Sequence, residues 1–253
     1  MEWIIGIILF FLGASIGSFI GVVVDRVPKG QSIIKPRSHC PVCGHELNAI
    51  DLIPVVSYIM LRGRCRYCGA KIPIQYWLLE VATGLWVAVL GLLALNTMNL
   101  RWVEIMIFGL FAIPIMWIDW KTFYMYDSML LPLIGVELVF SFVVHPPSLW
   151  ERLIAAAILF ALFGILYIVF KGKMGFGDVE LVTAIGLLLG SQSLLWPLFA
   201  GIYGLFSYLI PASRENNDEI PNNAVPFGPA MLLAALTLAL FGNQIFAWYL
   251  SLF

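Results

Sequence analysis

Long apolar runs separated by short polar segments dominate the chain. Runs of about 17 to 25 mostly apolar residues are typical of helices that cross a membrane. The sixth run is short, which fits a helix that starts inside the protein or is extended by the loop before it. The pattern predicts about eight spanning helices: Trp3–Val24, Tyr76–Leu95, Trp102–Ile118, Ser128–Val144, Leu153–Phe170, Val179–Gly190, Leu194–Ile210 and Phe227 to about Tyr249.

The composition agrees with a membrane protein. Of the 253 residues, 61% are hydrophobic and 11% are charged, which is more apolar surface than one globular core hides. The formal net charge of -1 provides no basic excess to neutralise phosphates, so no nucleic-acid partner is expected. The first run carries Glu2 in place of a basic segment, and we interpret it as a retained helix rather than a cleaved signal peptide. The predicted fold class is an all-α polytopic membrane protein.

The positive charges predict an orientation. Eight of the 14 Lys and Arg residues lie between Arg26 and Lys71, and only Arg101 and Arg152 fall in the alternate loops. Basic residues concentrate in cytoplasmic loops. This side is therefore predicted to be cytoplasmic, with both termini outside. The same side carries four further basic residues and a polar tract interpreted as a solvated connection: Lys121, Lys171, Lys173, Arg214 and Ser213–Asn223.

One large polar segment, residues 25–75, follows the first predicted helix (residues 1–24). It contains all four cysteines of the chain, in "CPVCG" (Cys40 and Cys43) and "CRYCG" (Cys65 and Cys68). Two Cys-x-x-Cys knuckles at this spacing favour a closed, structural zinc site with four thiolates. Disulfides are disfavoured in a reducing compartment, and a redox pair is the remaining alternative. The basic residues around the knuckles fit either anionic headgroups or a solvated face.

Carboxylates at one membrane face are the candidate catalytic groups. Asp178 begins the sixth predicted helix in "GFGD", between apolar residues and after Gly175 and Gly177, which allow a sharp turn and close approach. Capping of the helix is the simpler explanation for one such aspartate. The third predicted helix, however, ends at Asp119 on the same side. Two opposed aspartates that share a proton can activate water and polarise a peptide carbonyl.

Two other acidic residues compete for a role. Asp127 also lies at this face, but its position before Ser128 favours an N-cap, whereas Asp119 ends an apolar helix. Glu80 lies deep in the second predicted helix and is a further functional candidate. The sequence therefore favours Asp119 with Asp178, and leaves Asp127 and Glu80 as additional candidates.

These blocks together resemble the type IV prepilin peptidases. The resemblance covers nearly the whole chain and is carried by "GASIGSFIGVVVDRVP", "PRSHCPVCGHEL", "IPVVSYIMLRG", "LRGRCRYCGAKIP", "LLEVATG", "GFGDVEL" and "VPFGPAML". It implies an intramembrane aspartic endopeptidase of the Gly-x-Gly-Asp class in the bacterial cytoplasmic (inner) membrane. Such a protease cuts basic leaders from prepilins or pseudopilins on the cytoplasmic side. Position by position, the resemblance assigns the catalytic pair to Asp119 and Asp178 and excludes Asp127 from it.

The family comparison also implies a second activity and a domain division. Many members methylate the new amino terminus with S-adenosylmethionine, which would make residues 25–75 a methyltransferase region and 76–253 the peptidase domain. The chain departs from the usual Gly-Ser-Phe-Leu-Asn at Ile20 and Gly21. Further departures are Tyr126 for proline, Lys121 for an acidic residue and Glu180 for lysine. Both aspartates are intact, which predicts proteolysis; the amino-terminal change leaves methylation open.

Two other function classes are weighed against a peptidase. A proton-coupled transporter would use its membrane carboxylates as a relay, but such folds show repeat symmetry, and the cysteine loop has no counterpart in the other half of the chain. A membrane scaffold could dock partners through the zinc loop. That interpretation leaves the paired aspartates unexplained.

Overall fold

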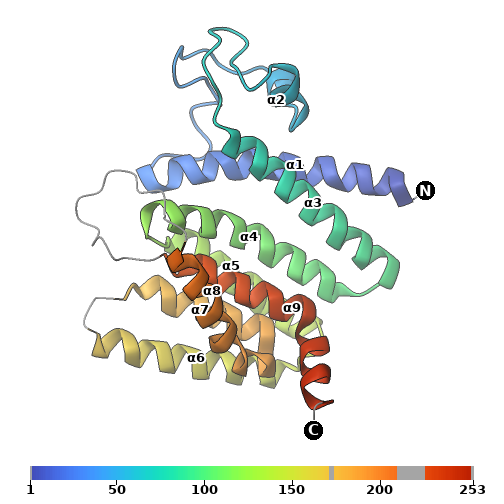
Figure 1. Ribbon diagram of the computed structural model, residues 1–253, viewed down its shortest axis with the longest axis vertical. Helices are drawn as coiled ribbons and strands as arrows, with labels where there is room; N and C mark the ends of the chain where they lie inside the picture. The colour runs from blue at the N-terminus through green and yellow to red at the C-terminus, as the bar shows by residue number, and fades with distance from the viewer. Residues whose placement is uncertain (1, 171–173, 210–225, 252–253) are drawn as a thin grey trace. The chain divides into compact units, whose positions relative to one another are not determined.

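The computed structural model describes residues 2–170, 174–209 and 226–251. Within these ranges the chain is all-helical, with only the isolated β-bridges His39–Glu46 and Arg64–Lys71. Figure 1 shows the α-helices in chain order. Their bounds are α1 Glu2–Arg26, α2 Val56–Met60, α3 Ile74–Thr97, α4 Leu100–Thr122, α5 Asp127–Val143, α6 Leu149–Val169, α7 Phe176–Leu189, α8 Trp196–Leu209 and α9 Gly228–Leu250.

Every predicted apolar run coincides with a helix, but fewer helices are long enough to span a membrane alone. Five described helices combine sufficient length with sufficient hydropathy: α1 with the turn after it, α3, α4, α6 and α9. A sixth candidate is the pair α7 and α8, which is bent by 106° at the break between them. The chain is thus a multi-pass membrane protein with five or six candidate spans in its described part, and a count of eight stays a prediction.

Several residues used to predict the orientation lie outside the described residues: Lys171, Lys173, Arg214 and the acidic tract Ser213–Asn223. Ile210, at the end of the seventh predicted run, also lies outside them. The cytoplasmic orientation therefore also stays a prediction.

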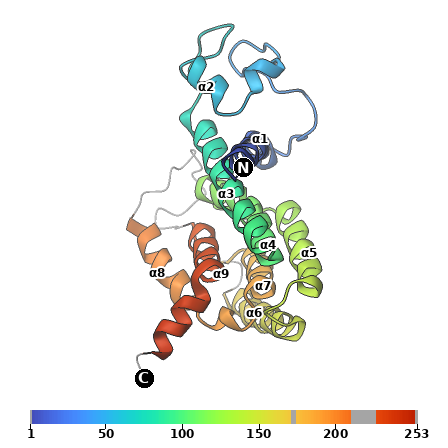
Figure 2. The ribbon, with the colours of Figure 1, turned by 90° about the vertical axis from the view of Figure 1, so that its right-hand side faces the viewer.

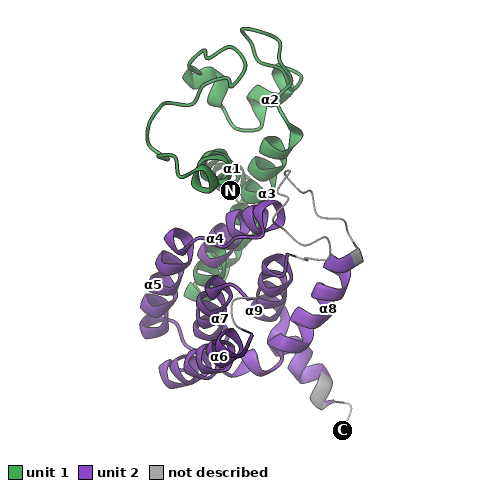
Figure 3. Cartoon of the chain, turned by 90° about the vertical axis from the view of Figure 1, so that its left-hand side faces the viewer, with its two compact units in different colours: residues 1–106 green, residues 107–253 purple. Residues whose placement is uncertain are grey.

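The chain divides into two compact units, Met1–Met106 and Ile107–Phe253 (Figure 3). In the first unit α1 packs closely along α3. The approach requires glycine, because a Cβ at Gly17 would overlap the side-chain oxygen of Thr83. Small residues of this kind let membrane helices approach backbone to backbone. Tyr76 then donates its phenolic hydrogen to Asp25, which joins the two helices at their loop end.

The loop between α1 and α3 belongs to the same unit and carries α2. The backbone just before α2 is unusual, because Val55, the residue that precedes the helix, has a φ of 65°. A β-branched residue rarely adopts a positive φ. The Val55 N–H donates a 2.7 Å hydrogen bond to Oε2 of Glu80 in α3. This hydrogen bond attaches Val55, and with it the start of α2, to the side of α3.

In the second unit, α7 lies among α5, α6 and α9 (Figure 2). Its residues from Val179 to Leu189 are buried, apart from the half-buried Thr183. The fully buried Arg152 of α6 donates to the main-chain oxygens of Val144 and Leu187. These carbonyls lie at the C-terminal ends of α5 and α7, where intrahelical partners are missing. Arg152 therefore holds three helix ends together.

Candidate active site and metal centre

Asp119 lies in the last turn of α4 and is only 4% exposed. Its Oδ2 atom accepts a 2.9 Å hydrogen bond from the backbone N–H of Gly228, the first residue of α9. The first amides of a helix have no intrahelical acceptor, and the helix dipole places partial positive charge there. The start of α9 therefore supplies a fixed donor to a buried carboxylate.

Asp178 lies in the first turn of α7, which the structure starts at Phe176 with Gly175 as N-cap. The interpretation of Asp178 as the capping residue is therefore wrong. Gly175 holds the cap position in an extended conformation, and its backbone N–H donates to the carboxylate of Asp178, the third helical residue. Its half-buried carboxylate at this end of α7 is still favoured by the helix dipole.

Met125 connects the surroundings of the two aspartates. A Cβ added to Gly177 would lie 2.9 Å from Cβ of Met125, and one added to Gly228 would lie 2.9 Å from Cε of the same residue. The added Cβ at Gly228 would also lie 2.7 Å from Oδ2 of Asp119. Asp178 lies within electrostatic range of Asp119. The structure thus brings together Asp119, Asp178 and Gly177.

Gly175 is less constrained, because the nearest atom to an added Cβ is Oδ2 of Asp178, at 3.8 Å. Gly228 was not predicted to have a role, although it belongs to the quoted block "VPFGPAML". The signal that could have found it is the Gly228–Pro229 pair at a helix start, because proline is favoured where the backbone amide has no helical acceptor.

Asp127 and Glu80 were the additional candidates. Asp127 is exposed and is the first residue of α5, whereas the N-cap position belongs to Tyr126, in an extended conformation. The predicted N-cap role of Asp127 is therefore wrong by one position; its charge instead complements the helix dipole. Glu80 belongs to the first unit, where it binds the Val55 amide.

The four cysteines form one cluster in the loop of the first unit. Their Sγ atoms all lie within 4.8 Å of one another, and those of Cys40 and Cys68 are 3.8 Å apart. A tetrahedron with Zn–S bonds of about 2.3 Å has edges of roughly 3.8 Å. The donor set and its spacing therefore fit a zinc ion.

The two knuckles repeat the same backbone turn. The amides of Gly44 and Gly69 each donate at 2.9 Å to the carbonyl of the first cysteine of their knuckle, and both glycines have a φ of 71°. Hydrogen bonds from the amides of Cys43 and Val42 lower the pKa of Cys40 to about 6. A thiolate is the form that binds a metal. This geometry prepares Cys40 to be a ligand.

Side chains outside the cysteine cluster tie the loop together. Asp51 accepts hydrogen bonds from Arg66 at 2.6 Å and from Tyr67 at 3.0 Å. The ring of His45 stacks on Tyr67, with centroids 3.6 Å apart. His45 thus has a packing role beside the cluster, and Asp51 fastens the segment between the knuckles to the second knuckle.

Comparisons with known proteins identify the family. Residues 11–94 match the bacterial peptidase A24 N-terminal domain, and residues 106–212 match the type IV leader peptidase family. A prepilin leader peptidase/N-methyltransferase of Aeromonas hydrophila is 31% identical over 100% of this chain and 96% of its own length. The chain belongs to the type IV leader peptidase family.

Other members of the type IV leader peptidase family carry the same name. The protein of Myxococcus xanthus (strain DK1622) is 32% identical, over 87% of this chain and 70% of its own length. That of Bacillus subtilis (strain 168) is 28% identical, over 97% and 98% respectively. No solved structure matches the chain. Membership in this family confirms the resemblance identified in the sequence, and neither a transporter nor a scaffold accounts for it.

Proposed function

We propose that the chain is an aspartic endopeptidase that removes the leader from type IV prepilins or pseudopilins at the cytoplasmic face of the inner membrane. The observation that carries this proposal is that Asp178 lies within electrostatic range of Asp119, with Met125 packed against both Gly177 and Gly228, in a chain of the type IV leader peptidase family. A basic leader followed by an apolar helix would present its cleavage point where a lipid-embedded helix ends. Asp119 and Asp178 both lie at helix ends.

The chemistry requires one carboxylate and one carboxylic acid. The carboxylate takes a proton from water as the water oxygen attacks the peptide carbonyl carbon, while the acid gives its proton to the carbonyl oxygen. The intermediate then collapses with proton transfer to the leaving amine. The Gly228 N–H binds Oδ2 of Asp119 and so fixes the rotation of that carboxylate, leaving Oδ1 for water and Asp178.

The loop of residues 25–75 would hold a structural zinc ion through Cys40, Cys43, Cys65 and Cys68. The ion would supply folding energy to a segment too small for a core of its own. Residues 76–253 would form the peptidase domain. No catalytic step passes through the metal, because four thiolates leave it no open position.

A second activity is favoured by the relatives, which are named peptidase/N-methyltransferases. We propose that the chain also methylates the new amino terminus, with S-adenosylmethionine as donor and residues 25–75 as the region involved. One local feature sets this chain apart. A Cβ at Gly21 would lie 3.1 Å from Cδ1 of Tyr76, so an asparagine at this position would require Tyr76 to move.

Mass spectrometry of a co-expressed prepilin tests both activities. The wild-type chain should yield a product that lacks its leader, and methylation would add about 14 Da to that product. Asp119→Asn and Asp178→Asn should each abolish leader removal, whereas Asp127→Asn should retain it. Normal processing by either of the first two variants, in protein that is inserted and folded, would exclude the proposed pair.

A further inference from the structure

The short helix α2 and the residues just before it expose several large apolar side chains of the loop between α1 and α3. Ile59 is 60% exposed and Met60 is 76% exposed. Ile50 and Ile53, which precede the helix, are 65% and 42% exposed. A cluster of exposed apolar side chains rimmed by polar ones indicates an interaction surface. We call residues 50–64 the interfacial segment.

Two contacts place this segment beside α3 rather than beyond its end. Val55 donates to Glu80, which lies six residues after Ile74 at the start of α3, or roughly 9 Å along the helix. The rings of Tyr58 and Trp77 are 6.2 Å apart. The interfacial segment is therefore level with the first turns of a helix that is long and apolar enough to span a membrane.

The first turns of α3 themselves expose apolar side chains. Ile74 is 59% exposed and Leu78 is 46% exposed, one helical turn apart. On a membrane-spanning helix, such a face contacts lipid. The apolar side chains of α2 thus lie at the same level as the lipid-facing start of α3, and any bilayer that surrounds α3 also reaches α2.

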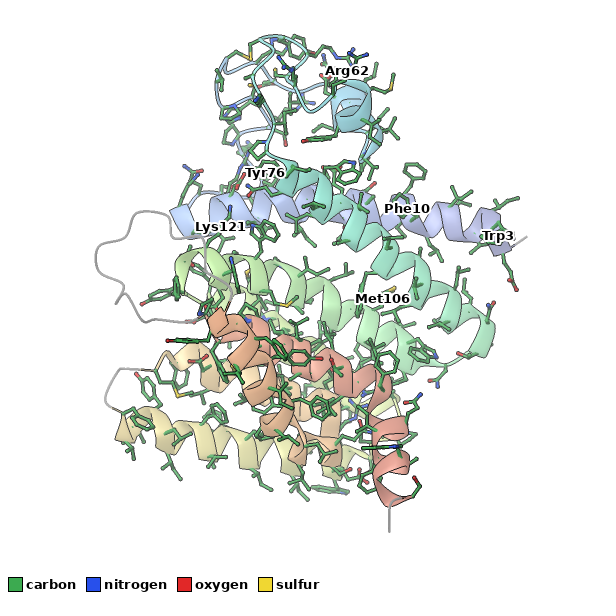
Figure 4. The ribbon with its side chains drawn as sticks, in the orientation of Figure 1. Trp3, Phe10, Arg62, Tyr76, Met106 and Lys121 are labelled. Carbon is green, nitrogen blue, oxygen red and sulfur yellow. The ribbon has the colours of Figure 1, made fainter. Side chains whose placement is uncertain are left out.

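The charge of the loop selects the kind of lipid. Residues 26–75 contain eight basic and two acidic side chains. Arg62 and Arg64 follow α2 directly and are exposed; Figure 4 shows Arg62 beside this helix. Each basic side chain near an anionic membrane surface contributes about 1 kcal/mol of attraction. Basic residues next to exposed apolar ones are typical of helices that lie in the interface plane.

We propose that the interfacial segment lies in the headgroup layer of an anionic bilayer, with Ile59 and Met60 inserted among the acyl chains and Arg62 on the phosphates. The lipid is that of the membrane spanned by α3. A basic peptide leader is disfavoured as the occupant, because the loop is itself basic. Insertion would hold the cysteine cluster against the membrane surface. This proposal does not depend on the peptidase reaction.

Photocrosslinking of the full-length chain in lipid nanodiscs tests this inference. p-Benzoylphenylalanine incorporated at Met60 should form lipid adducts in phosphatidylglycerol nanodiscs, and mass spectrometry should detect at least fivefold more adduct than for the same group at Val42. Val42 is the matched control, because it is an apolar side chain of the same loop, 72% exposed, on the first knuckle. Equal adduct yields at the two positions would overturn the inference.

A second measurement separates lipid from other occupants. Arg62→Gln should reduce the Met60 adduct in phosphatidylglycerol nanodiscs and leave it unchanged in phosphatidylcholine nanodiscs. Zinc content should be unaffected, because Arg62 makes no contact with the cysteines that the structure records. A Met60 adduct that forms only when a prepilin peptide is added, and is then a peptide adduct, would assign the surface to substrate and contradict the proposal.

Discussion

The backbone N–H of Gly228 and the carboxylate of Asp119 are joined by a 2.9 Å hydrogen bond across 109 positions of the chain. This bond connects the start of α9 to the end of α4. The donor is a main-chain N–H, which every residue except proline keeps. A substitution at Gly228 therefore disturbs the bond only through the space that the new side chain occupies. That space is already filled by Asp119 and Met125.

Gly228→Ala should therefore reduce leader cleavage by at least tenfold. The added Cβ would lie 2.7 Å from Oδ2 of Asp119 and would push the carboxylate out of its position. Cleavage rates measured on a purified prepilin check this. Gly201→Ala is the matched control, because a Cβ at this helical glycine meets no atom within 4 Å, and it should retain full activity.

The two glycines before Asp178 should respond differently. Gly177→Ala brings a Cβ to 2.9 Å from Cβ of Met125 and should lower both the cleavage rate and the melting temperature. Gly175→Ala meets only Oδ2 of Asp178 at 3.8 Å and should leave the melting temperature unchanged. Thermal unfolding in detergent distinguishes them. An equal loss of stability in both variants would contradict the packing argument.

Replacement of a single cysteine should release the metal from the loop. Cys43→Ser removes one of four thiolates, and the remaining three hold zinc far less tightly because a closed tetrahedral site is lost. Elemental analysis should find about one zinc per wild-type chain and much less in the variant. Val42→Ser, at the adjacent exposed position, should keep the metal. Wild-type protein without zinc, purified in the absence of chelators, would refute the assignment.

Arg152→Met should destabilise the second unit by about 3 kcal/mol or more. The change removes the donors to the carbonyls of Pro147, Val144 and Leu187, and buried carbonyls without partners are costly. Arg152→Lys keeps the charge but cannot reach all three oxygens, so it should lie between wild type and Arg152→Met. Chemical unfolding checks the order. Trp150→Phe, at a 72% exposed neighbouring position, should be nearly neutral.

The apolar runs located every long described helix to within a few residues, because apolar runs of membrane length have few other interpretations. They could not locate the details that depend on single backbone conformations. Asp127 was expected at an N-cap, and an N-cap was the simpler alternative for Asp178; Tyr126 and Gly175 occupy these positions instead. Propensity favours aspartate at a cap, but the cap residue is decided by where the chain turns.

The candidate site was predicted in part. The sequence paired Asp119 with Asp178 because both were expected at one membrane face; in the structure Asp178 lies within electrostatic range of Asp119, and their catalytic role stays a prediction. The contribution of Gly228 was not predicted, because the sequence signals its backbone amide only through Pro229, which marks the start of a helix. The strained Val55 was likewise invisible, since its hydrogen bond to Glu80 depends on how the loop returns to α3.

The enclosure of α7 decides how a substrate can arrive. With 14 residues this helix is about 21 Å long, shorter than the roughly 30 Å apolar layer of a bilayer, and other helices surround it. Burial of α7 begins at Val179, whereas Gly175 and Phe176 are exposed and Asp178 is half-buried, so we expect a peptide to meet Asp178 from the Gly175 end. A protease built this way would trim the tip of a membrane helix rather than cut through its middle.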